Sequence, residues 1–236
     1  MTTTPHHDQD SAGLAERSNK IRAAVLGAND GIVSTAGLVL GVAGATTSTP
    51  AILTAGFAGL VAGALSMATG EYVSVSSQRD TERAAVAQES RELAEQPEEE
   101  LAELAGLFQK RGLSADVAHE VAVELTQRDA LAAHTREEFG IEPGEYINPW
   151  AAALSSLLAF TSGALLPLLG MAFLPPDVRV VATFVAMLVA LVVTGYVSAR
   201  LGGAQRGRAV ARNVAGGALA MAVTYAIGRL IGGAVA

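Results

Sequence analysis

The stretch AILTAGFAGLVAGALSMATGEYVSVSSQRDTERAAVAQESRELAEQP, residues 51–97, decides the fold because it changes from apolar to acidic without a helix breaker. Residues 51–77 are apolar enough to cross a bilayer, which takes about 20 helical residues. Neither glycine nor proline occurs between Glu71 and Pro97, so we expect one helix to leave the membrane and continue into water. This segment predicts an all-α membrane protein with a polar helical part attached to its second span.

Four further apolar segments give five predicted transmembrane helices in all, at residues 21–45, 51–77, 148–174, 178–199 and 210–236. We expect a three-helix cytoplasmic insert between the second and third spans. The predicted domains are a cytoplasmic polar tail (1–20), transmembrane helices 1 and 2 (21–79), acidic cytoplasmic metal-binding helices (80–145) and transmembrane helices 3 to 5 (146–236).

Charge is segregated along the chain. Residues 80–145 contain 17 of the 23 acidic residues and only 6 of the 16 basic ones, so a strongly acidic module interrupts an apolar, mildly basic chain. The sequence contains no cysteine, which excludes thiolate metal sites and disulfides. The basic residues flank the predicted spans, and nothing indicates nucleic-acid binding.

The positions of lysine and arginine predict the topology. The basic residues that flank one side of the membrane are Arg17, Lys20, Arg22, Arg79, Arg83, Arg200, Arg206, Arg208 and Arg212, whereas the opposite loops carry only Arg179. The positive-inside rule then places the N-terminus and the acidic module in the cytoplasm. We expect a multi-pass protein of a bacterial plasma (inner) membrane; an organelle membrane is the alternative.

Two carboxylates fall inside otherwise uncharged spans, Asp30 in the first and Glu71 in the second. Each lies eight residues inward of a flanking arginine, roughly 12 Å along a helix, so the two side chains can meet at one level. Such acids face a partner or an ion path, and this pair suits a divalent cation with extra oxygens from Asn29 or Ser74. Met67, one turn from Glu71, would favour a transition metal; simple packing is the alternative for all three side chains.

The acidic module carries further candidate ligands. Glu89 lies five whole helical turns beyond Glu71 and Glu92 lies near the same face. Two more pairs lie one turn apart, Glu100 with Glu103 on the helix after Pro97, and His134 with Glu138 in a 4-3-4-3-4 row on the third helix. These faces predict a site for several divalent ions; the alternative is a solvated acidic surface.

Two motifs resemble a known family. Residues 27–35 (GANDGIVST) and 63–76 (GALSMATGEYVSVS) resemble the first-span and second-span signatures of the vacuolar iron transporter family, and the similarity covers roughly residues 17–236. The resemblance implies a homodimeric transporter of ferrous iron, often also manganese, that runs in exchange for protons. It implies ions held by Asp30, Met67 and Glu71.

The resemblance also implies metal-binding glutamates in the acidic module. The matching positions are Glu89, Glu92, Glu100, Glu103 and Glu138. His134 and Thr135 stand where the eukaryotic pattern has a methionine pair, and His134 is itself a candidate ligand.

The sequence therefore predicts a secondary transporter, a metal/proton antiporter and not an enzyme, that moves Fe²⁺ or Mn²⁺ out of the cytoplasm. The metal is the transported substrate, and we expect no permanently bound cofactor. We expect a homodimer in the lipid bilayer, because five spans are few for enclosing a pathway. The alternatives are a Mn²⁺-selective exporter, a structural protein, and a membrane-anchored ferritin-like iron oxidase or storage protein; the last is disfavoured because Glu-x-x-His is absent from the sequence.

Overall fold

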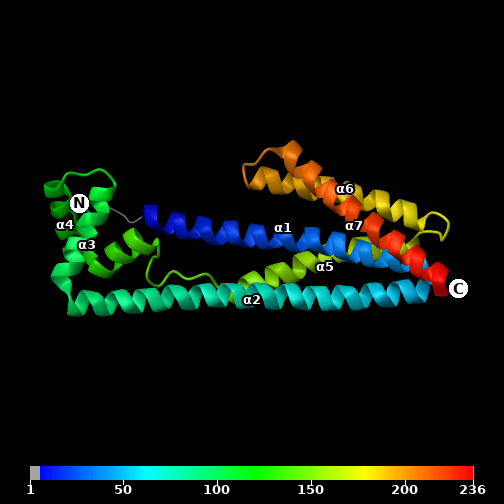
Figure 1. Ribbon diagram of the computed structural model, residues 1–236, viewed down its shortest axis with the longest axis horizontal. Coiled ribbons are helices and arrows are strands. Elements are labelled where there is room, and N and C mark those ends of the chain that lie inside the picture. Colours follow the sequence, from blue (N-terminus) through cyan, green and yellow to red (C-terminus); the bar gives the residue numbers. More distant parts are fainter. Residues whose placement is uncertain (1–5, 236) are drawn as a thin grey trace. The chain divides into compact units, whose positions relative to one another are not determined.

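The computed structural model describes the backbone of residues 6–235 and the side chains of residues 23–234. Within this part of the chain every regular element is a helix (Figure 1). The elements are α1 (His6–Ala45), α2 (Thr49–Glu95), α3 (Pro97–Lys110), α4 (Ala115–His134), the π-helix η1 (Thr135–Phe139), α5 (Pro149–Phe173), α6 (Arg179–Leu201) and α7 (Arg206–Val235). The predicted all-α class is confirmed.

Five of these helices contain segments long and apolar enough to cross a membrane, as predicted. They are Ala23–Ala45 of α1, Thr49–Glu95 (α2), Pro149–Phe173 (α5), Arg179–Leu201 (α6) and Arg206–Ala234 of α7. At 1.5 Å per residue the 47 residues of α2 extend about 70 Å, more than twice the roughly 30 Å of a hydrocarbon core. The apolar first part of α2, residues 51–77, is about 40 Å long at the same rise per residue, so it can span a membrane by itself.

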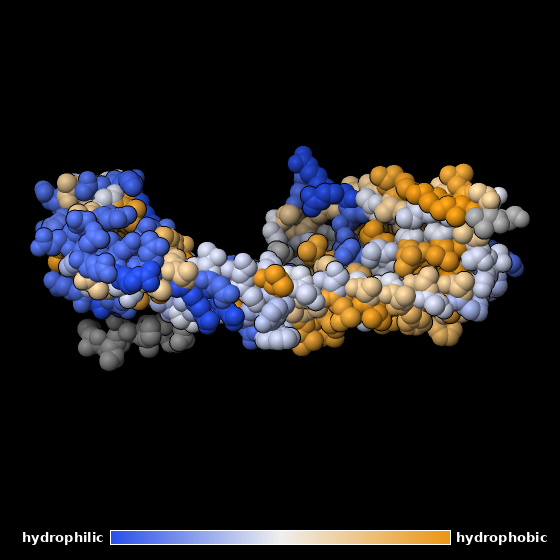
Figure 2. Space-filling model, turned by 60° about the horizontal axis from the view of Figure 1, so that its bottom comes forward, coloured by the Kyte–Doolittle hydropathy of each residue, from blue (hydrophilic) through white to orange (hydrophobic). Residues whose placement is uncertain are grey.

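The chain divides into two compact units. The first, which we call the membrane unit, comprises residues 1–73 and 149–236, and the second, the acidic unit, comprises Ser74–Asn148. The division falls inside α2, which contributes to both. Hydrophobic residues cover much of the visible surface of the membrane unit, and hydrophilic residues cover that of the acidic unit (Figure 2).

The membrane unit is built around α1, which packs against α5, α6 and α7. Its core includes Ile32 and Leu40 of α1, Phe160 of α5 and Met221 of α7. Glycine brings the backbones together: a Cβ on Gly228 of α7 would overlap the carbonyl oxygen of Gly41 in α1.

A buried arginine joins the start of α6 to the connection between α1 and α2. The guanidinium of Arg179, at the start of α6, donates to the Thr49 Oγ1 at 2.7 Å and to the Thr47 carbonyl oxygen at 2.8 Å. Arg179 is only 3% exposed, so these bonds replace its lost hydration. The sequence marked Arg179 only as a loop charge.

The acidic unit has a small core of its own, formed where α3 packs on α4. Leu104, Phe108, Ala118 and Ala122 are buried there. Gly112 ends the α3 turn with φ +101°, and Gly140 follows η1 with φ +69°, both in the left-handed region that favours glycine.

The third helix of this unit is not continuous, contrary to the predicted 4-3-4-3-4 row. Asp129 has φ −164° and ψ 94°, and its side chain accepts a hydrogen bond from the Ala132 amide at 3.0 Å. The carboxylate thus caps a new helical segment, which ends in the π-helix η1. The row is interrupted, because Glu120 and Glu124 precede the break and are exposed while His134 follows it and is buried.

The residues of the predicted polar tail that the structure describes are helical. The helix α1 begins at His6, so residues 6–20 continue the first membrane helix. The good helix formers Ala, Leu, Glu, Arg and Lys within this segment account for the extension. Residues 1–5 lie outside the described part of the chain.

Substitution of Gly228 by alanine is expected to lower the stability of the membrane unit by about 1–3 kcal/mol, because the new methyl group has to push α7 away from α1. The matched control is Gly233→Ala in the same helix, where an added Cβ meets no atom within 4 Å. Thermal unfolding in detergent measures the difference. Equal melting temperatures for the two variants would contradict the close α1–α7 contact.

Candidate metal centre

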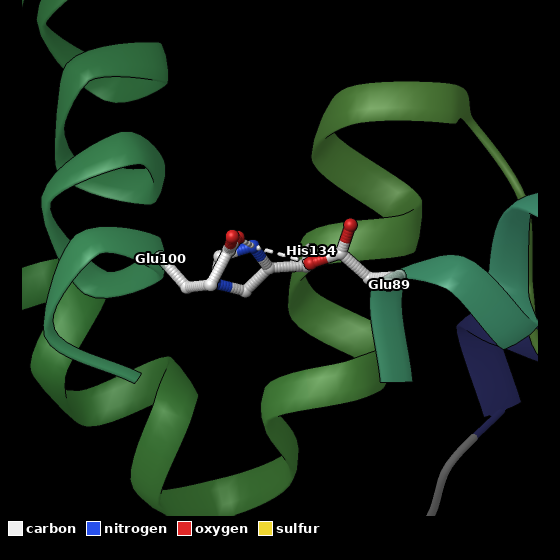
Figure 3. Close-up of side chains that lie close together, drawn as sticks. All are labelled: Glu89, Glu100 and His134. Carbon is white, nitrogen blue, oxygen red and sulfur yellow. Dashed lines mark ion pairs between the residues drawn. The ribbon is translucent and has the colours of Figure 1, made fainter. Parts of the chain in front are cut away.

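Three side chains from three elements converge inside the acidic unit (Figure 3). Nδ1 of His134 lies 3.0 Å from Oε1 of Glu89 and 3.5 Å from Oε2 of Glu100. One ligand atom from each residue lies within 4.8 Å of the others, which is the spacing of ligands around one ion. We call Glu89, Glu100 and His134 the buried triad.

The buried triad is withdrawn from water. Glu89 is 1% exposed, His134 is 0% and Glu100 is 8%. Among the described residues, no hydrogen bond of acceptable geometry satisfies Glu89 Oε1 or either nitrogen of His134. Polar atoms buried in this way cost free energy unless something binds them, and a cation would satisfy the oxygens and the imidazole nitrogen together.

Local sequence explains how each member reaches this point. Glu89 lies on the last turns of α2, which ends at Glu95. Pro97 is compatible with the first turn of α3, where a missing amide hydrogen costs nothing, and it places Glu100 one turn into that helix. His134 lies between the break at Asp129 and the π-helix η1, and its side chain contacts Glu89 and Glu100.

Burial and like charges oppose ionisation of the carboxyl groups. The pKa of Glu89 is raised to about 7, first by burial and then by the charges of four neighbours, Glu100, Glu138, Glu92 and Glu103. Burial is also the largest cause that raises the pKa of Glu100, while its hydrogen bond with Glu89 acts in the opposite direction. Burial, reinforced by these like charges, therefore lets Glu89 retain a proton near neutral pH.

The imidazole has the complementary property. Burial lowers the pKa of His134, and the charge of Glu103 opposes that effect. A neutral imidazole keeps a lone pair on one nitrogen and can bind a metal through it.

The other predicted ligands of this unit surround the buried triad at its edge. Glu92 and Glu103 raise the pKa values of triad carboxyls through their charges. Glu138 has its own pKa raised, mainly by burial and by Glu103, while a hydrogen bond with Glu89 lowers it. Glu103 and Glu138 are exposed and Glu92 is half-buried. Together they supply a negative rim through which a cation can approach.

A second group of predicted ligands lies in the membrane unit. Asp30 and Met67 line a cavity of about 210 Å³ between α1, α2 and α5, together with Ser34 and Ser66. Glu71 follows Met67 by one turn of α2, is half-buried, and is not among the lining residues of this cavity. The structure thus brings Asp30 and Met67 to one cavity.

Asn29, expected to add an oxygen ligand beside Asp30, faces a different part of the bundle. Its Oδ1 accepts a hydrogen bond from Asn213 Nδ2 at 2.9 Å and one from Thr194 Oγ1 at 3.4 Å. The sequence patterns did not single out Asn213 or Thr194. The available signal was an amide and a hydroxyl within apolar spans, where polar side chains commonly bond across helices.

Carboxylate oxygens with one imidazole suit divalent ions of the Mn²⁺, Fe²⁺ and Zn²⁺ type. We expect Glu100→Gln to weaken binding of Fe²⁺ to the anaerobic, purified protein by about 10-fold or more, because the amide keeps the size of the side chain and loses its charge. Isothermal titration calorimetry measures this loss.

The control is Glu99→Gln, the exposed neighbour in the same helical turn. It changes net charge equally and should leave the affinity within about twofold. Equal losses in the two variants would show that general negative charge, and not the buried triad, binds the ion.

Metal affinity should also depend on pH. A proton has to leave Glu89 before its carboxylate binds a cation, and its pKa of about 7 means that this proton is present at lower pH. Between about pH 7.5 and 6 the affinity for Fe²⁺ should fall by up to roughly tenfold per pH unit below that pKa, as for one competing proton. An affinity that stays flat across this range would contradict the raised pKa.

Comparison with known proteins adds to this geometry. Residues 21–229 match the model of the VIT family. The chain is 44% identical over 211 residues to a vacuolar iron transporter of Acanthamoeba castellanii, covering 89% of this chain and 78% of that protein. It is 40% identical over 219 residues to vacuolar iron transporter homolog 2 of Arabidopsis thaliana (92% and 87%), and 39% identical over 222 residues to vacuolar iron transporter homolog 5 of Oryza sativa subsp. japonica (94% and 85%).

Proposed function

Since the chain belongs to the VIT family, we propose that it is an iron transporter that moves Fe²⁺ across a membrane as a metal/proton antiporter. The observation that carries this proposal is the buried triad of Glu89, Glu100 and His134 in a chain with five membrane-spanning helices. Relatives named vacuolar iron transporter support iron as the substrate. The metal is cargo, and the chain acts on it by binding and release, not by a chemical reaction.

Capture of the ion is assigned to the acidic unit. Its negative rim attracts cations, and the buried triad then replaces part of their hydration shell with two carboxylates and an imidazole. Binding relieves the repulsion among the carboxylates, which contributes after burial to their raised pKa values. Several ions are expected to share Glu92, Glu103 and Glu138 with the triad.

Passage through the membrane is assigned to Asp30, Met67 and Glu71. Support comes from the cavity that Asp30 and Met67 line and from the cost of a carboxylate among apolar spans, which is usually met by an ion path or a polar neighbour. The thioether sulfur favours a transition metal over Mg²⁺ or Ca²⁺. α2 is one helix from Thr49 to Glu95 and carries Met67 and Glu71 as well as Glu89, so it is the element that connects capture with passage.

Protons provide the exchange. A carboxylate has to be deprotonated to hold the metal, so protons that arrive from the far side compete with Fe²⁺ for Asp30 and Glu71 and release it there. The distribution of arginines supports an N-terminus and an acidic unit in the cytoplasm, and hence movement out of the cytoplasm. Export across a plasma membrane and sequestration in an organelle both remove the ion from the cytoplasm, so this scheme applies to either membrane.

Manganese is the second candidate substrate. The donor set is carboxylate-rich and lacks cysteine, so it suits Mn²⁺ as well as Fe²⁺. We also propose a homodimer, because five spans are few for enclosing a transport pathway.

Transport by reconstituted protein tests this function. In proteoliposomes with an imposed pH gradient, Asp30→Asn should reduce Fe²⁺ flux by at least about 10-fold, because the isosteric amide cannot exchange a metal for a proton. Collapse of the gradient with a protonophore should reduce wild-type flux as well. The matched control is Asp177→Asn in the exposed turn before α6, which should transport normally.

Undiminished proton-coupled flux in the Asp30 variant would overturn the proposed pathway. Faster flux of Mn²⁺ than of Fe²⁺ in competition would reassign the substrate while leaving the pathway intact.

A further inference from the structure

A second cavity, of about 410 Å³, lies in the membrane unit between α1, α6 and α7. It shares no lining residue with the cavity of Asp30 and Met67. Its volume falls in the range of about 300–1,000 Å³ that is usual for small-molecule sites. The proposed transport pathway makes no use of it.

The lining of this cavity is amphipathic. Val25 and Leu26 of α1 and Leu201 of α6 provide apolar walls, while Ser198 of α6 and Arg212 of α7 provide a hydroxyl and a guanidinium. An occupant that matches both needs an apolar part and a hydrogen-bond acceptor.

Among the side chains that the structure describes, the cavity is lined by a positive charge, that of Arg212, and by no negative charge. Arg212 is the only charged residue among those lining it, and no acidic side chain faces it there. Within the described part of the chain no ion pair neutralises Arg212, and Arg200, Arg206 and Arg208 add positive charge in the same turn region. A guanidinium next to apolar walls favours an anion, and its planar fork suits phosphate oxygens.

The position of the cavity identifies the source of the anion. Its walls come from the last residues of α6, the first turns of α7 and the beginning of the α1 span, so it lies at one end of the apolar segments. That end is where the headgroups of a bilayer meet its hydrocarbon, and basic pockets between spans at this level bind anionic lipid headgroups. A soluble phosphate ion would make no favourable contact with the apolar walls, whereas the acyl chain of a lipid would.

The geometry points to a binding site for one anionic phospholipid, whose phosphate is held by Arg212 and Ser198 and whose acyl chain lies against Val25, Leu26 and Leu201. The lipid contacts the three helices together, α1, α6 and α7. Asn29 also lines the cavity, and its hydrogen bond to Asn213 joins the deep end of the site to the α1–α7 contact.

Native mass spectrometry of the full chain, released from nanodiscs of phosphatidylcholine with a minor fraction of phosphatidylglycerol, tests the site. Wild-type protein should retain phosphatidylglycerol, and Arg212→Gln should lower the retained amount by about five- to tenfold. The control Arg208→Gln removes the same charge from the same region but from outside the cavity lining, and should lower it by less than about twofold.

A second variant, Ser198→Leu, fills the cavity without changing charge and should reduce retention as strongly as Arg212→Gln. Equal retention by the Arg212 and Arg208 variants would overturn the site, because charge near the membrane surface would then suffice. Release of the lipid by inorganic phosphate, or equal retention of phosphatidylcholine, would also overturn it.

Discussion

The burial of two neighbouring carboxyl groups, Glu89 and Glu100, away from water is the constraint on which the acidic unit depends. Glu89 and Glu100 are buried beside His134, and no cation from the described residues neutralises them fully. In water such carboxylates would separate, but α2, α3 and the segment after Asp129 hold them together. The cost appears as the raised pKa of Glu89, about 7, and a divalent ion bound there would offset it. The acidic unit thus buries candidate metal ligands whose polar atoms its described residues do not fully pair.

The membrane unit meets a different constraint, because apolar helices gain little from one another in lipid unless they pack closely. The overlap that a side chain on Gly228 would cause with Gly41 shows how near α7 comes to α1. Polar contacts supplement this packing where it ends: Arg179 binds Thr47 and Thr49. A firmly held α1 keeps Asp30 at a defined place in the wall of its cavity.

Much of the fold was predictable because the bilayer imposes a length and a composition. The predicted spans 21–45 and 148–174 compare with the observed Ala23–Ala45 and Pro149–Phe173. The triad residues were also among the predicted ligands, since carboxylates without basic partners signal a need for cations. Helical spacing could not show that Glu92, Glu103 and Glu138 remain at the edge while Glu89, Glu100 and His134 are buried, because burial depends on how the helices pack.

Two local features escaped the pattern. No glycine or proline marks the break at Asp129. Aspartate favours caps over helix interiors but occurs in both, so its presence alone does not predict a break. The orientation of Asn29 away from the Asp30 cavity depends on Asn213 and Thr194, which are distant in sequence. The first feature arises from a capping hydrogen bond within the helix, and the second from hydrogen bonds between helices. Hydrophobic periodicity carries no information about either kind of bond.

The break at Asp129 has a consequence for the orientation of His134. Because helical rotation restarts at the cap, the residues that dock α4 on α3 and the residues that aim His134 follow separate registers. The segment that follows the break is still anchored to the rest of the acidic unit, because Ala133 packs on the hydrophobic cluster of α3 and α4 and Glu137 pairs with Arg111. The direction in which His134 points therefore depends on a single capping carboxylate, and a change at Asp129 would turn the imidazole away from the two glutamates of the buried triad without altering any of its three side chains.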